Sequence, residues 1–156
     1  MTRPTVPLAR DLMTRRLHTL TPSTSLFDAV AFLLRHDISG APVVDETGRL
    51  VGLFSELDCL RALAGGEFYD HGYYAAHTVA DLMSEASHTI APDLDLFAIA
   101  GTFVTLRVRR LPVVEDGRLV GLVGRRDMLA AIDRLRRERG REKRYPDYPK
   151  GREPTD

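Results

Sequence analysis

The chain of 156 residues contains two tandem copies of one sequence unit. The segment DLMTRRLHTLTPSTSLF, residues 11–27, aligns with DLMSEASHTIAPDLDLF, residues 81–97. Farther along, PVVDETGRLVGL at residues 42–53 aligns with PVVEDGRLVGL at residues 112–122, and the second copy is one turn residue shorter. Chance does not produce such ordered agreement, so we interpret the chain as a duplication of a unit of about 55 residues.

The pattern within each unit predicts the order β-α-β-β-α. HTLTP and HTIAP are short β-prone segments that end at a proline. SLFDAVAFLLRHD and LFAIAGTFVTLRV are apolar enough for buried helices, with N-caps from Ser23 or Thr24 and from Asp93 or Asp95. Two short strands joined by a turn follow, and then a second helix. The predicted strands are APVVD with RLVGLFS and LPVVE with RLVGLVG, and the predicted final helices are ELDCLRALA and RRDMLAAIDRLRRE.

A single unit of this size exposes too much of its surface to bury a convincing core. Two copies that pack through their sheets about a pseudo-twofold axis would cover each other's apolar faces. The expected fold class is therefore α+β, with two related clefts between the copies.

Composition restricts the class of protein. The 22 Lys and Arg residues balance 22 Asp and Glu residues, and 44% of the chain is apolar, which argues against a uniformly basic nucleic-acid binder and against general disorder. The one cysteine, Cys59, excludes a disulfide framework and a multi-thiolate zinc site. Apolar runs are too short to span a membrane, so we expect a soluble, cytoplasmic protein without a membrane partner.

The neutrality hides an asymmetry along the chain. From Arg134 to the end, nine basic residues face five acidic ones, and few apolar residues remain there. We therefore expect repeat 1 at residues 8–64, an aromatic-rich linker at 65–77, repeat 2 at 78–135 and a basic, disordered tail at 136–156.

The repeated residues carry a family resemblance. Each unit resembles the cystathionine β-synthase (CBS) domain, and the chain resembles a tandem pair of such domains, or Bateman module. The resemblance rests on the ordered motifs D-x-M, a later threonine and proline, h-P-V-V-D or E, and G-R-L-V-G-L followed by an aspartate. The resemblance implies a regulatory, non-catalytic module that binds AMP, ADP, ATP or S-adenosylmethionine between the repeats. It also implies a disc-like homodimer.

Ser55 and Asp58 stand where a strand ends and a helix begins, and they allow two interpretations. A carboxylate in the first helical turn can accept hydrogen bonds from both hydroxyls of a ribose, while the helix N-terminus favours a nearby phosphate. Alternatively, the two residues form only a capping box. The second copy has Gly124 instead of the serine but keeps Asp127. That retention favours a ligand role for the aspartate, and compensation of the helix dipole explains it nearly as well.

The resemblance implies which residues share each cleft. Ser55 and Asp58 would face the second repeat, where Asp58 and Thr78 would hold the ribose, Arg109 and Arg110 would meet phosphate, and the backbone near Val79 and Leu111 would flank adenine. The predicted nucleotide-binding residues are Ser55, Asp58, Thr78, Val79, Arg109, Arg110, Leu111 and Pro112. A planar guanidinium suits phosphate because it pairs with two oxygens at once.

The other cleft would group Asp127 with Leu8, which stands in place of the threonine, and with Ser39, Gly40, Ala41 and Pro42. Gly124 departs from the family pattern there, and the segment offers no positive charge, so we expect this cleft to be weak or empty.

The linker, Cys59 and the basic tail say less about function. The linker histidines and acids fit no metal motif, and Cys59 has no histidine partner in the pattern, so we expect neither a metal site nor an enzyme. The expected partners are an adenosine-containing ligand, a second copy of the chain and an effector protein that the sequence does not name. The alternative hypothesis is an interaction scaffold or nucleic-acid-binding protein that uses its basic tail, although interruption of that tail by Glu138 and Glu142 argues against nucleic acid as a partner.

Overall fold

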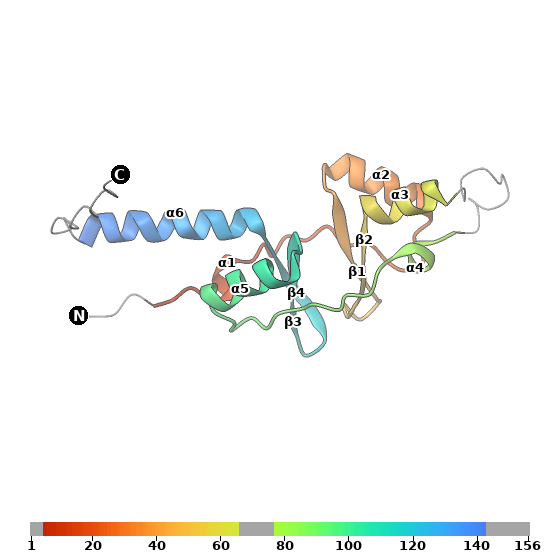
Figure 1. The fold of residues 1–156 in the computed structure, drawn as a ribbon. Helices are drawn as coiled ribbons and strands as arrows, with labels where there is room; N and C mark the ends of the chain where they lie inside the picture. The colour runs from red at the N-terminus through yellow and green to blue at the C-terminus, as the bar shows by residue number, and fades with distance from the viewer. Residues whose placement is uncertain (1–4, 66–76, 143–156) are drawn as a thin grey trace, which may run out of the picture.

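A computed structural model of the chain describes residues 5–65 and 77–142 (Figure 1). Repeat 1 contributes the helices and strands α1 (Ala9–Leu12), α2 (Leu26–His36), β1 (Gly40–Val44), β2 (Leu50–Ser55) and α3 (Glu56–Ala64). Repeat 2 contributes α4 (Val79–Leu82), α5 (Leu96–Leu106), β3 (Arg110–Glu115), β4 (Arg118–Gly124) and α6 (Arg125–Glu142). Within these ranges no helix is both long and apolar enough to cross a membrane.

Each repeat is built on an antiparallel hairpin, as predicted. Pro42 of β1 lies opposite Leu53 of β2, and Pro112 of β3 lies opposite Leu122 of β4. The strand predicted at the start of each unit is reduced to a single parallel bridge, from Leu20 to Val43 in repeat 1 and from Ile90 to Val113 in repeat 2. The prolines that follow these segments lack an N–H, which stops the ladder from continuing.

The segment that leads each repeat packs on the other repeat. The short helices α1 and α4 were not predicted from the sequence. The N–H of Ala9 in α1 donates to the carbonyl oxygen of Leu94 over 2.8 Å, and the N–H of Val79 in α4 donates to that of Thr24 over the same distance. Ala9 and Val79 are fully buried. This exchange of leading segments makes the two repeats interdependent, because the core of each repeat contains a residue from the other.

The described residues form two hydrophobic cores. The core of repeat 1 consists of Leu20, Leu26, Ala29, Leu33, Ala41, Val43, Phe54 and Val79. The core of repeat 2 consists of Ala9, Ile90, Leu96, Ile99, Phe103, Leu111, Val113, Val123, Met128 and Ala131.

The exchange also explains why methionine and glycine recur in both units. A Cβ at Gly52 in β2 would lie 2.6 Å from the Sδ of Met83, which follows α4. A Cβ at Gly121 in β4 would collide with Met13, which follows α1. The methionine of each D-x-M motif thus packs on the glycine of the other repeat, and a side chain at that glycine would displace it.

The tips of the two hairpins contact each other and close the pseudo-symmetric arrangement. The N–H of Leu50 donates to the carbonyl oxygen of Gly117 over 3.4 Å, and the N–H of Leu119 donates to that of Gly48 over 3.1 Å. Both glycines have positive φ, 81° at Gly48 and 78° at Gly117, which the tight turns require.

The helix ends differ slightly from the prediction. Ser25 caps α2 by accepting from the N–H of Asp28 over 3.2 Å, so neither Ser23 nor Thr24 is the cap. Asp95, one of the two predicted candidates, caps α5. Helix α6 continues to Glu142, beyond the predicted end of repeat 2 at residue 135. Most of the predicted linker and the chain from residue 143 lie outside the described residues.

Candidate functional site

A cavity of about 470 Å³ lies between the two repeats. Its walls come from the start of β1, the junction of β2 with α3, the residue after Met83 and the segment that leads into β3. We call it the Asp58 cavity; its lining residues are Ser39, Gly40, Ala41, Leu53, Phe54, Ser55, Glu56, Leu57, Asp58, Leu60, Ser84, Val108, Arg109 and Arg110. It combines an apolar wall with carboxylates, hydroxyls and guanidinium groups.

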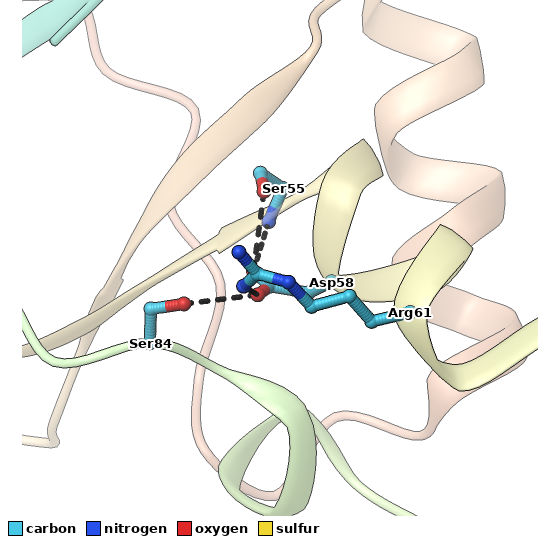
Figure 2. Close-up of polar contacts among 4 residues, drawn as sticks. All are labelled: Ser55, Asp58, Arg61 and Ser84. Carbon is cyan, nitrogen blue, oxygen red and sulfur yellow. Dashed lines mark hydrogen bonds and ion pairs between the residues drawn. The ribbon is translucent and has the colours of Figure 1, made fainter. Parts of the chain in front are cut away.

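Asp58 is the buried acid of this cavity, with 5% of its surface exposed. Its Oδ2 accepts the backbone N–H of Ser55 over 2.8 Å and the Ser55 hydroxyl over 3.2 Å. Its Oδ1 accepts the hydroxyl of Ser84 over 2.9 Å, as Figure 2 shows. The guanidinium of Arg61 lies 3.6 Å from the same Oδ1 and remains largely exposed. Donors from both repeats therefore meet at one carboxylate.

The capping contact made by Asp58 recurs at the start of other helices. In α1, α4 and α6 the carboxylate at the third helical position also accepts the backbone N–H of the N-cap residue. The pairs are Leu8 with Asp11, Thr78 with Asp81 and Gly124 with Asp127. Since the donor is a backbone group, the contact needs no serine. The retention of Asp127 beside Gly124 is thus explained by capping, and it no longer favours a ligand role for the aspartate.

Arg110 connects the two repeats across the cavity. Its Nη1 donates to the carbonyl oxygen of Gly40 over 2.7 Å, and its Nη2 donates to the hydroxyl of Ser39 over 2.6 Å. Partial burial lowers the pKa of Arg110, the neighbouring charge of Arg109 lowers it further, and Glu56 opposes both. Arg110 thus holds the rim of the cavity in place with one face of its planar fork.

Arg109 is the more accessible cation at the cavity. Its side chain is 74% exposed, and its Nη1 lies 4.0 Å from a carboxylate oxygen of Glu56. An exposed pair at that distance is weak and easily exchanged for another partner. Arg109 is therefore able to turn toward an anion at the mouth.

The grouping of residues into clefts differs from the prediction. Ser39, Gly40 and Ala41, which were predicted to share the cleft of Asp127, line the Asp58 cavity instead. The reason is that β1 and β2 are paired, with Gly40 opposite Ser55, so the start of β1 lies beside the start of α3. Asp127 is not among the lining residues.

Four residues predicted for the Asp58 cleft do not line the cavity. Val79, Leu111 and Pro112 are fully buried; Val79 of α4 packs into the core of repeat 1 and Leu111 of β3 into the core of repeat 2. The N–H and hydroxyl of Thr78 both donate to Asp81. Ser55, Asp58, Arg109 and Arg110 are brought together as expected.

Ser84 and the apolar wall were not predicted from the sequence. Ser84 follows the D-x-M motif at the position where repeat 1 has Thr14. The recurrence of a hydroxyl residue there could have indicated a role for Ser84. Its N–H and carbonyl pair with Leu53, which attaches the segment as an edge beside β2. That backbone pairing carries the Ser84 hydroxyl to Asp58.

Comparison with known proteins agrees with this architecture. CBSX2 from Arabidopsis thaliana, a chloroplastic CBS domain-containing protein, is 29% identical over 153 residues, which cover 82% of this chain and 64% of CBSX2. The chain thus spans somewhat less than two thirds of that relative. The crystal structure of CBSX2 in complex with AMP superimposes with a TM-score of 0.73 and 32% identity, covering 83% of this chain and 98% of that one.

A second solved structure extends the range of ligands seen among similar proteins. The CBS domain pair of protein MJ0100, in complex with 5-methylthioadenosine and S-adenosyl-L-methionine, has a TM-score of 0.66 and 28% identity, covering 89% of this chain and all of that chain. The CBS domain family model matches this sequence at residues 9–65 and again at 79–134. The chain therefore belongs to the CBS domain family and contains its domain as a tandem pair.

Proposed function

We propose that this protein is a non-catalytic regulatory module that binds an adenosine-containing ligand in the Asp58 cavity. The observation that carries the proposal is a cavity between two repeats that joins a buried carboxylate to an apolar wall and a cationic mouth. The similar structures with AMP and with S-adenosyl-L-methionine support the same ligand class.

The residues suggest how such a ligand would be held. Ribose hydroxyls would donate to Asp58 and displace the exposed side chain of Arg61, whose ion pair with Asp58 is the weakest contact there. The adenine ring would lie against the apolar wall, which includes Ala41, Leu53 and Val108. A phosphate or carboxylate would lie near Arg109, while Arg110 keeps Ser39 and Gly40 in position.

Ligand binding would act through the arrangement of the two repeats. The cavity takes residues from both, so a ligand that fits one relative arrangement better would increase its population. In this proposal the module senses adenine nucleotides, and thereby cellular energy state, and reports to an effector protein. Two copies associate as a homodimer, and the cytoplasm stays the predicted location.

A ligand screen by thermal unfolding tests the proposal. The compounds are AMP, ADP, ATP, S-adenosylmethionine and NAD(H), with GMP as the matched control for the base. A ligand at 100 times its Kd adds about 2.7 kcal/mol to the free energy of unfolding, a shift that is easily measured. We expect a shift with at least one adenosine compound and none with GMP. The absence of any shift, together with RNA or DNA binding that weakens steeply with salt, would replace this proposal by the scaffold hypothesis.

A further inference from the structure

The helices that carry the repeats leave a duplicated apolar face exposed. Four pairs of equivalent side chains from α2 and α3 of repeat 1 and α5 and α6 of repeat 2 are at least half exposed. They are Phe27 and Phe97, Leu34 and Val104, Leu60 and Leu129, and Leu63 and Ile132. Leu34 and Val104 are 76% and 78% exposed, which is unusual for aliphatic side chains at the same position of two repeats. Exposed apolar patches of this kind mark interaction surfaces.

The two faces carry opposite charges at two equivalent positions. In repeat 2 an apolar groove of about 400 Å³ between α5 and α6 is flanked by Arg107 and Arg125. Asp37 and Glu56 occupy the same two positions of repeat 1. Asp37 and Arg107 are both C-caps in the left-handed conformation, with φ of 50° and 54°. The substitution of charge therefore leaves the local backbone unchanged.

The net charge of the matched helices also differs in sign between the two faces, by a small excess on each. Across α2, its C-cap and α3, three carboxylates stand against two arginines when the buried Asp58 is left out. Across α5, its C-cap and the matching residues 125–133, three arginines stand against two carboxylates. Figure 1 shows α2 and α3 in one half of the molecule and α5 and α6 in the other.

Local helix stability does not account for all of these charges. An acid at the C-terminus of a helix and a base at the N-terminus both oppose the helix dipole. Asp37 ends α2 and Arg125 begins α6, so both are in unfavourable places by that criterion. Arg125 has a compensating contact, because its Nε donates to the carbonyl oxygen of Val108 over 3.0 Å. Asp37 has no side-chain hydrogen bond or ion pair among those found in the described residues.

We propose that a second copy of this chain covers these faces in a head-to-tail orientation, with repeat 1 of each copy against repeat 2 of the other. This inference rests on the homodimer of the proposed function and adds its orientation. In the head-to-tail arrangement, both contacts pair an acidic face with a basic one. A head-to-head arrangement would pair acid with acid and base with base, and like charges across an interface are repelled.

Exchange of the charges at the two equivalent caps tests the orientation. Asp37→Arg and Arg107→Asp place at each position a residue that the other repeat already carries there with the same backbone conformation. In a head-to-tail dimer each single substitution weakens the dimer about five- to tenfold at low salt, since a twofold axis uses it twice. The double variant returns the Kd to within about twofold of the parent. In a head-to-head dimer both copies carry each change, so like charges still face each other and neither single substitution weakens association, a result that would overturn the inference.

A second measurement reads the orientation directly and does not depend on charge. In a Cys59→Ser background, a dye is attached at Arg35→Cys or at the equivalent Thr105→Cys, both on exposed positions. Head-to-tail association brings a donor at position 35 near an acceptor at position 105 of the other copy, so energy transfer is high for that mixture and low when both dyes are at position 35. The reverse pattern overturns the inference, and so does a monomer at all concentrations in analytical ultracentrifugation.

Thermal shifts with AMP, measured on the same samples, keep the two proposals separate. A ligand shift without head-to-tail association rejects only the orientation, and a head-to-tail dimer without any ligand shift rejects only the ligand.

Discussion

The guanidinium of Arg110 in repeat 2 is bonded to the backbone of Gly40 in repeat 1, with its Nη1 donating to the carbonyl oxygen over 2.7 Å. The same group reaches Ser39 over 2.6 Å. An arginine that could have been reserved for a ligand is thus part of the scaffold of the cavity. The cavity therefore needs residues from both repeats. Ligand affinity can depend on the relative arrangement of the repeats only under this condition.

Replacement of Arg110 tests this connecting role. Arg110→Lys keeps the charge but cannot place two donors in one plane. Either Ser39 or Gly40 therefore loses its hydrogen bond to this side chain. We expect AMP affinity to fall about tenfold in the lysine variant, because one lost charge-assisted hydrogen bond costs about 1.5 kcal/mol, and to fall further in Arg110→Ala, which loses both bonds. Isothermal titration calorimetry measures the affinity. Full recovery of affinity in the lysine variant would show that only the charge matters.

Asp58 and Asp127 form a matched pair for testing the ligand site, since each accepts a backbone N–H at a helix start. Asp58→Asn removes the carboxylate that would hold the ribose, so we expect AMP binding to become undetectable by calorimetry. Asp127→Asn costs similar helix-capping energy, about 1 kcal/mol, but leaves the Asp58 cavity unchanged. Equal binding by the two variants, or loss of binding only in the Asp127 variant, would place the ligand elsewhere.

Gly52 tests the packing of one repeat's leading segment on the other. A methyl group there would lie 2.6 Å from the Sδ of Met83 and 2.9 Å from the carbonyl oxygen of Ser84. We expect Gly52→Ala to lower the free energy of unfolding by about 1 to 3 kcal/mol in urea titrations. The control is Gly101→Ala, because nothing lies within 4 Å of the added methyl in helix α5. That change should raise stability by up to about 1 kcal/mol, and destabilisation of similar size in both variants would contradict the packing argument.

A stacked histidine pair leads us to expect that the stability of repeat 1 depends on pH. The rings of His18 and His36 stack with centroids 3.9 Å apart. Partial burial lowers the pKa of His36, and the charges of His18 and Arg35 lower it further. The folded state therefore binds this proton more weakly than the unfolded state does. Stability falls as the pH drops through the ordinary histidine pKa of about 6.5 toward the lower folded value, and it is unaffected above that range.

Thermal unfolding at pH 7.5 and pH 5.5 measures this effect. We expect the Tm of the parent to fall on acidification by more than the Tm of His36→Gln, which lacks the titrating group. His88→Gln is the control, because His88 is the counterpart of His18 in repeat 2, where Leu106 replaces His36. It should keep the parent's pH dependence. An identical response of the parent and the His36 variant would show that the stacked pair has no part in it.

Much of the secondary structure could be predicted from the sequence, because its signals are local. The hairpins follow from valine-rich runs on either side of a glycine-containing turn, and the helices from dense apolar runs. The short helices α1 and α4 were missed, since four residues are too few to show a period. The N-cap at Ser25 was missed by one or two residues because three hydroxyl residues stand in a row before α2.

The candidate site could be predicted in part. Ser55, Asp58, Arg109 and Arg110 are identified by the sequence pattern and do line one cavity. The pattern places Ser39 in the wrong cleft and gives no role to Ser84. Both errors concern backbone pairings between segments, Gly40 with Ser55 and Leu53 with Ser84. The residue types at these positions do not predict such pairings.

The sequence by itself determined that the protein is a duplicated unit, which elements each unit contains and which positions of the two are equivalent. These follow from repetition and from periodicity within a few residues. Only the tertiary structure decided that each leading segment packs on the opposite repeat, so that Met83 rests on Gly52 and donors from both halves meet at Asp58. Two related units offer similar surfaces to either segment, and the choice between them depends on how both cores fill together.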